Sequence, residues 1–112
     1  MLKKIGNWKI TFLETGTFWL DGGAMMGSVP KVLWEKTNAP DDKNRIKLAL
    51  RCLLLDNGES RVLIESGIGN KFDSKFSKMF SISQSKEPLC DALSNSGYSH
   101  KDITHVLLTH LH

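Results

Sequence analysis

Two histidines separated by one residue, His110 and His112, have the type and spacing of a metal-binding pair. Side chains at positions i and i+2 of an extended chain point to the same side, so both imidazoles can reach one ion. Zinc accepts imidazole nitrogen and usually takes four ligands, or three ligands and a water. The pair therefore predicts the first part of a metal site; a chance pairing or an expression scar at a terminus is the alternative.

The pair is expected to be positioned by two antiparallel strands, a helix and a final strand. Residues 45–55 alternate apolar and polar side chains, the period of a half-buried strand. Residues 56–58 (Asp-Asn-Gly) suit a type I′ hairpin turn, which predicts that residues 61–64 return antiparallel. A helix is predicted over residues 87–96, with Ser85 as a possible cap, and a buried strand over residues 103–109.

The remaining sequence predicts two short strands, over residues 8–13 and 17–20. Residues 24–36 have no clean period and are interpreted as an ordered surface loop. Phenylalanines recur at every fourth position at residues 72, 76 and 80, which favours a helix face on the core. The whole order is hairpins, then a helix, then a strand.

Composition bounds the class of protein. The chain has 112 residues, so it is at most one small domain, and its net charge of +3 is spread without a basic stripe, which argues against nucleic-acid binding. No apolar stretch approaches the roughly 20 residues that cross a bilayer, and no signal-peptide core follows the start. Cys52 and Cys90 form no CxxC pair and are expected to be buried thiols of a cytoplasmic protein.

Three stretches resemble one known family. The end of the chain, I-T-H-V-L-L-T-H-L-H (103–112), resembles the opening of the H-x-H-x-D-H signature of the metallo-β-lactamase superfamily. V-L-I-E-S-G-I-G (62–69) resembles the strand, acidic residue, small residue and glycine that precede the family's metal loop. D-G-G-A-M-M-G (21–27), followed by V-P-K-V-L-W (29–34), resembles a loop of members close to the quorum-quenching lactonases.

The resemblance implies roles for particular residues. His110 and His112 would bind the first zinc ion of a pair, and the aspartate and histidine that follow in the family would come after residue 112. Glu65 stands where the family most often has aspartate, and it is expected, with Thr109, to support the ligands or the fold without binding metal. A solvated charge at a strand end is the alternative for Glu65.

Three apolar residues of the 24–36 loop are candidates for the mouth of an apolar acyl pocket that would bind substrate: Met25, Met26 and Trp34. Packing of this loop on the sheet is the alternative. The fold implied is α+β, a four-layer αββα sandwich of two mixed sheets with helices outside. Residues 1–112 would be the N-terminal half of that single domain, and we expect them to have negligible activity alone, marginal stability and a tendency to associate into homo-oligomers.

The implied activity is zinc-dependent hydrolysis of an ester, lactone or related bond in a small-molecule substrate. Zinc lowers the pKa of bound water to about 7, and the resulting hydroxide attacks a carbonyl or phosphoryl centre. Two alternatives from other classes stay open: an iron-dependent redox enzyme on the same fold, and a non-catalytic fragment or binding module.

Overall fold

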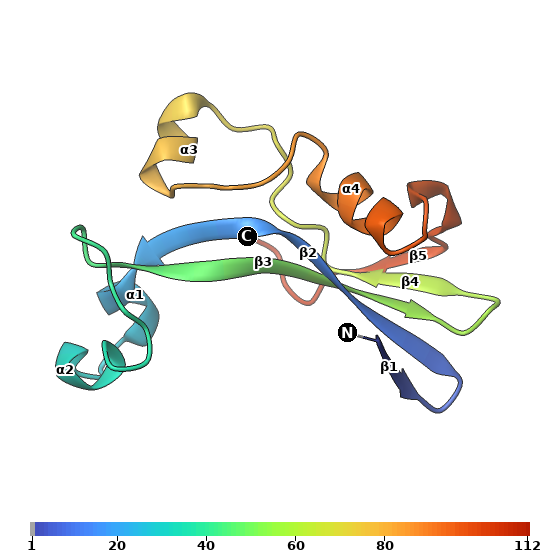
Figure 1. Ribbon diagram of the computed structural model, residues 1–112, viewed down its shortest axis with the longest axis horizontal. Helices are drawn as coiled ribbons and strands as arrows, with labels where there is room; N and C mark the ends of the chain where they lie inside the picture. Colours follow the sequence, from blue (N-terminus) through green and yellow to red (C-terminus); the bar gives the residue numbers. More distant parts are fainter. Residues whose placement is uncertain (1) are drawn as a thin grey trace. The chain divides into compact units, whose positions relative to one another are not determined.

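The computed structural model describes residues 2–112, which contain one mixed five-stranded sheet in the order β1-β2-β3-β4-β5 (Figure 1). The β1–β2 and β3–β4 pairs are antiparallel, whereas β4 and β5 are parallel. The strands are β1 (Leu2–Ile5), β2 (Trp8–Asp21), β3 (Arg45–Asp56), β4 (Arg61–Ile64) and β5 (His105–Leu107). The helices are α1 (Gly22–Met26), α2 (Lys31–Trp34), α3 (Ser74–Met79), α4 (Pro88–Asn95) and the 3-10 helix η1 (His100–Asp102).

The chain divides into two compact units. The first contains Met1–Gly16, Leu50–Lys71 and Gln84–His112, and the second contains Thr17–Ala49 and Phe72–Ser83. The long strands β2 and β3 each contribute residues to both units, and the two strands predicted over residues 8–13 and 17–20 are one continuous strand.

The core of the first unit lies between its strands and α4. The alternation predicted for residues 45–55 is confirmed, because Cys52 and Leu54 on one face are buried. Each fully buried leucine contributes about 1.5–3 kcal/mol of transfer free energy. The core cluster consists of Leu13, Cys52, Leu54, Leu63, Ala92 and Leu93. Helix α4 is therefore anchored to the sheet through its second turn.

Helix α4 confirms the helix predicted over residues 87–96, but its predicted cap is wrong. The N-cap residue is Glu87, which makes no capping hydrogen bond through its side chain. Pro88 occupies the first turn, where its missing N–H leaves no helical hydrogen bond unmade. The Ser85 hydroxyl instead donates to Asp91 Oδ2 at 2.5 Å. The helix therefore begins with Pro88 and a hydrogen bond between the Ser85 and Asp91 side chains, and Ser85 does not bond to the backbone N–H groups as a cap would.

The β3–β4 hairpin is confirmed, while its predicted turn type is wrong. Asp56 pairs with Arg61, so the connection contains four residues rather than two. A type I′ turn needs two central residues with positive φ, and within this connection only Gly58 has one, at 92°. The Asp56 carboxylate accepts a hydrogen bond from the Gly58 N–H at 2.8 Å. The four-residue turn is therefore stabilised by hydrogen bonds from backbone N–H groups to the Asp56 and Asn57 side chains, and it is not a two-residue type I′ turn.

Strand β5 is shorter and more exposed than predicted. It covers His105–Leu107 only, and all three residues are exposed, with Val106 at 58%. An apolar run of this length is equally compatible with a buried and an exposed strand at a sheet edge. The prediction of a buried strand over residues 103–109 is therefore wrong in burial, although it places the strand correctly.

The second unit contains the segment predicted to be a loop. Residues 24–36 include most of α1 and all of α2, which are five and four residues long and so too short to show a helical period. Asp21 caps α1 by accepting from the Ala24 N–H at 2.8 Å. Trp34 packs on Gly22, where a Cβ would lie 2.4 Å from the indole ring, so only glycine fits. This contact fixes α2 against the start of α1.

The phenylalanine series does not form a core face. Phe76 lies on α3 and is exposed, and its ring contacts those of Phe72 and Phe80, with centroids 5.6 and 4.7 Å away. Phe72 and Phe80 are half-buried and flank α3, so the three rings contact one another without forming the predicted helix face on the core.

Candidate metal centre

The parallel pairing of β4 with β5 brings two polar segments to one edge of the sheet. Ile64 pairs with Leu107, and the Glu65 N–H donates to the Leu107 carbonyl at 3.0 Å. Both strands end here in the same direction, so the residues that follow them lie side by side. Functional groups commonly gather at such strand ends because the sheet holds the loops rigidly.

Glu65 turns the chain at the end of β4. Its φ of 67° is in the left-handed region, which is uncommon for a residue with a side chain. The carboxylate Oε1 accepts from the Thr109 N–H at 2.7 Å and also from the Thr109 hydroxyl. These contacts join residues 44 positions apart and tie the loop after β5 to the end of β4.

The same contacts set the charge state of Glu65. The Thr109 hydroxyl, followed by the Thr109 backbone N–H, lowers the pKa of this carboxyl below its ordinary value, and burial opposes the shift. The nearby rings of His110 and His112 lower the pKa further. An anionic carboxylate is therefore held 3.8 Å from His110 Nδ1.

His110 and His112 converge as their spacing predicts. Their Nε2 atoms are 2.9 Å apart, and the rings meet edge to face with centroids separated by 4.7 Å. The other nitrogen of the first ring, His110 Nδ1, lies 2.8 Å from the Thr109 hydroxyl. Atoms this close can both contact a cation that bonds imidazole nitrogen at about 2.0–2.1 Å. The pair fits a metal ion as two of its ligands.

The described residues supply only part of a ligand set. Within residues 2–112, no group of three or more histidine, cysteine, aspartate or glutamate side chains is arranged to hold a metal ion. Glu65 faces Thr109 with its carboxylate, and its contact with the site is through hydrogen bonds. His105, at the start of β5, bonds through Nδ1 to the Thr104 hydroxyl at 2.8 Å.

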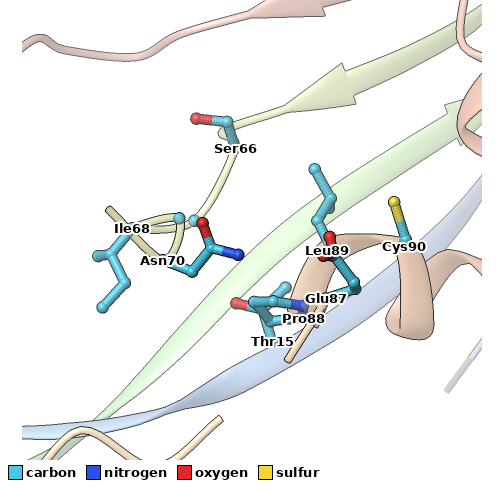
Figure 2. Close-up of a pocket in the computed structure, with 10 residues that line it drawn as sticks. Thr15, Ser66, Ile68, Asn70, Glu87, Pro88, Leu89 and Cys90 are labelled. Carbon is cyan, nitrogen blue, oxygen red and sulfur yellow. The ribbon is translucent and has the colours of Figure 1, made fainter. Parts of the chain in front are cut away.

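A cavity that the sequence did not predict follows Glu65 directly. Figure 2 shows the loop after β4 and the start of α4 around this space of about 190 Å³, with Thr15 on β2. The lining residues are Thr15, Ser66, Gly67, Ile68, Gly69, Asn70, Glu87, Pro88, Leu89 and Cys90. The glycine-rich segment after β4 could have indicated it, because Gly67 and Gly69 both have positive φ, which lets the loop bend along one side of the cavity. Cys90, expected to be buried, is half-buried here, whereas Cys52 is fully buried.

The three residues predicted to line a substrate pocket belong to the second unit. Met25 on α1 is 47% exposed, and Met26 is half-buried. Trp34 is only 5% exposed because its ring lies on Gly22. Their role toward a substrate stays a prediction.

Comparison with known proteins identifies the family. The family model described as the metallo-beta-lactamase superfamily matches residues 49–112, which contain most of the β3–β4 hairpin, α4 and the histidine pair. The chain belongs to the metallo-beta-lactamase superfamily. The resemblance inferred from the sequence is thus confirmed, and the five-stranded mixed sheet with its helices agrees with the predicted fold class.

Solved structures of this superfamily share the fold. A probable metal-dependent hydrolase from Staphylococcus aureus is 35% identical over 98% of this chain and 40% of its own, with a TM-score of 0.89. The hydrolase AbOPH is 25% identical over 99% of this chain and 35% of its own, with a TM-score of 0.73. The dizinc quorum-quenching lactonase AidC, in complex with a product, N-hexnoyl-L-homoserine, is 21% identical over 100% of this chain and 36% of its own, with a TM-score of 0.68.

The chain therefore spans about 40% of the length of the first of these metallo-beta-lactamase-fold proteins. No curated protein sequence matches it significantly. Among the described residues, no helix is long and apolar enough to cross a membrane.

Proposed function

We propose that the protein carrying this chain is a zinc-dependent hydrolase that cleaves an ester, lactone or related bond in a small molecule. The observation that carries the proposal is the convergence of the two Nε2 atoms of His110 and His112, 2.9 Å apart, after β5 and within the segment that the superfamily model matches. Metal-dependent hydrolases among the structural relatives support the class of reaction. Two zinc ions are proposed for the whole site, and this chain supplies two ligands for one of them.

The residues of this chain bind and orient rather than react. His110 and His112 would hold the cation through Nε2, and Glu65 holds the loop that carries them by accepting two hydrogen bonds from Thr109. When bound, a zinc ion would polarise the scissile carbonyl and make water acidic enough to react near neutral pH. A site held by hydrogen bonds to a sheet edge loses little conformational entropy on binding, which favours high metal affinity.

The proposal is tested by removing and restoring the metal in the intact protein. After chelation, zinc, iron and manganese are added separately, and hydrolysis of an aryl ester and of an acyl-homoserine lactone is measured together with the bound metal content. We expect zinc to restore hydrolysis of at least one substrate in the native protein and not in the His110→Gln variant. Restoration by iron alone, with redox turnover in place of hydrolysis, would overturn the proposal in favour of the redox class.

The substrate preference within this class is proposed from the segment that resembles the lactonase loop, residues 21–34. A lactone turned over much faster than the aryl ester is the expected result. The cytoplasmic location also stays a prediction, with which the two free cysteines agree.

A further inference from the structure

We propose that Asn57 is a site of spontaneous modification: its side-chain amide deamidates through a cyclic imide with Gly58, and the folded β3–β4 turn restrains this reaction until the hairpin opens. This inference is independent of the proposed hydrolase function. It concerns the connection between Asp56 and Arg61, which belongs to the first unit and lies at the end of the hairpin.

The reaction needs only the two residues and water. Glycine has no side chain to hinder its nitrogen, so an asparagine followed by glycine is the dipeptide most prone to deamidation. The Gly58 nitrogen loses its proton and attacks Asn57 Cγ; the Cγ–Nδ2 bond breaks, and Nδ2 takes up a proton and leaves as ammonia. Water then opens the imide. Breaking the new N–Cγ bond gives aspartate, whereas breaking the bond to the main-chain carbonyl carbon gives isoaspartate, whose backbone runs through Cβ.

The dipeptide is accessible to solvent. Gly58 is exposed, and a Cβ placed on it would meet no atom within 4 Å. Within residues 2–112, no hydrogen bond holds Asn57 Nδ2, the group that leaves. Water can therefore reach the imide and ammonia can diffuse away, so burial does not restrain the reaction.

The nucleophile is restrained by a neighbouring carboxylate. The Gly58 N–H donates to Asp56 Oδ1 at 2.8 Å, and the Asp56 Oδ2 atom is fixed by the Tyr98 hydroxyl, which donates to it at 2.8 Å. An anion next to a carboxylate is unfavourable because like charges repel. Removing the proton from the Gly58 nitrogen is therefore harder in the folded turn than in a chain where this contact is absent.

The electrophile is restrained by the backbone of the same turn. Asn57 Oδ1 accepts hydrogen bonds from the Glu59 N–H at 3.0 Å and from the Ser60 N–H at 2.7 Å. The Asn57 N–H also donates to the Ser60 carbonyl at 3.2 Å. Bringing Cγ onto the Gly58 nitrogen requires the side-chain bonds to break. Opening of the turn therefore precedes the reaction.

A second dipeptide that could form the same imide, Asp21-Gly22, is protected differently. An aspartate before glycine reacts by losing water in place of ammonia. The Gly22 N–H donates to the Asn44 carbonyl at 2.7 Å, and Gly22 is buried against the Trp34 ring. This nitrogen is held by the backbone and by packing, so we expect it not to react in the folded protein.

Modification should also hold the hairpin open. An aspartate at position 57 could still accept the two N–H bonds of the turn. Isoaspartate adds a backbone carbon to the connection between Asp56 and Arg61, so this product cannot close the turn in its native register. Opening permits the reaction, and one of its products then prevents the hairpin from closing again.

The experiment follows modification in the intact protein at neutral pH, folded and in urea. Mass spectrometry of digested samples distinguishes asparagine, aspartate and isoaspartate at position 57. We expect deamidation to be about 10–100-fold faster in urea, because up to three hydrogen bonds must open first in the folded protein. Asp56→Ala removes the restraining carboxylate and should raise the folded-state rate about 10-fold. Glu59→Ala removes the same charge from the same turn but keeps the backbone N–H, and it should react at close to the native rate.

Three results would overturn the inference. The first is an equal rate in the folded and unfolded native protein, and the second is the absence of modification in urea. The third is a native rate in Asp56→Ala, or an acceleration in Glu59→Ala as large as in Asp56→Ala, because either would show that the contact to Gly58 does not restrain the reaction. If Asp56→Ala does not fold, the comparison of folded and unfolded native protein decides the question.

Discussion

The two ends of β5 carry the same dipeptide, Thr-His, in two different environments. At the start of the strand, the Thr104 hydroxyl is held by the backbone N–H and carbonyl of Arg61. Beyond the end of the strand, the Thr109 hydroxyl is held by the carboxylate of Glu65. In both, the hydroxyl also contacts Nδ1 of the next histidine at 2.8 Å.

The two dipeptides differ in the groups that surround the threonine hydroxyl and the histidine ring. The Thr104 hydroxyl donates to the Arg61 carbonyl of the neighbouring strand β4, and the His105 side chain is exposed to solvent. At Thr109 the carboxylate brings negative charge beside the ring, and His112 brings a second imidazole to the opposite nitrogen. Thr104-His105 therefore joins β5 to β4 through hydrogen bonds, whereas Thr109-His110 places one imidazole beside a second one that could bind the same metal ion.

The largest expected effect comes from removing the paired imidazoles. His110→Gln or His112→Gln should weaken zinc binding by more than about 100-fold, because a ligand bond is lost rather than a supporting hydrogen bond. The measurement is zinc affinity by chelator competition. His105→Gln is the matched control and should bind as the native protein does; an equal loss in His105→Gln would erase the distinction between the two ends of the strand.

Metal binding should also raise the free energy of unfolding. A ligand at 100 times its dissociation constant raises the free energy of unfolding by about 2.7 kcal/mol, provided that it binds only the folded state. We expect such a rise for the native protein and for His105→Gln when zinc is added during urea unfolding. No rise is expected for the double variant His110→Gln/His112→Gln, and an undiminished rise there would place the zinc elsewhere.

Whether a feature could be predicted depended on how far apart in the sequence the interacting residues lie. The alternation of residues 45–55 predicted strand β3 because burying one face of a strand forces a period of two. Leu89 and Leu93, four residues apart, predicted α4 because that spacing brings side chains onto one helix face. Both signals are local, so both could be found in the sequence.

The supporting half of the site is not local. The pairing of Glu65 with Thr109 joins positions 44 residues apart and depends on the parallel register of β4 with β5 and on the left-handed backbone at Glu65. Spacing revealed the histidine pair, and the family resemblance marked Glu65 and Thr109 for a supporting role. Which atoms they use could come only from the structure. The burial of Trp34 on Gly22 was hidden for the same reason, since α1 and α2 are too short to show a period.

A smaller effect is expected at the first of the two dipeptides. Thr104→Val removes the hydroxyl that accepts from the Arg61 N–H, whereas the Arg61 carbonyl keeps its bond from the Thr104 N–H at 2.9 Å. The variant also loses the hydroxyl's bonds to the Arg61 carbonyl and to His105 Nδ1, but all of these groups are exposed and can bond to water, so we expect a total cost of about 0.5–1.5 kcal/mol of unfolding free energy. Urea unfolding measures it. A zinc affinity that fell together with this stability would show that the two ends of β5 are coupled rather than independent.

Lowering the pH should affect the unfolding free energy, because a carboxylate that accepts hydrogen bonds lies near each end of β4. Near the Thr104 end, Asp56 accepts from the Gly58 N–H, which is the main reason that its pKa lies below the ordinary value, and then from the Tyr98 hydroxyl at 2.8 Å. Burial opposes the shift, and Arg61, whose Nε is 3.5 Å away, adds to it. The charged form of Asp56 is therefore favoured in the folded protein.

The sign of the pH dependence follows from that preference. A carboxyl whose pKa is lower in the folded than in the unfolded state stabilises the fold at every pH above its unfolded pKa, about 3.9. This stabilisation disappears as the pH falls through the folded value, so acid should loosen the hairpin that Thr104 borders. Tyr98→Phe removes one of the two main donors and should flatten the loss of unfolding free energy between about pH 5 and about pH 2. A native slope in Tyr98→Phe would mean that the Tyr98 hydroxyl does not contribute to the lowered pKa of Asp56.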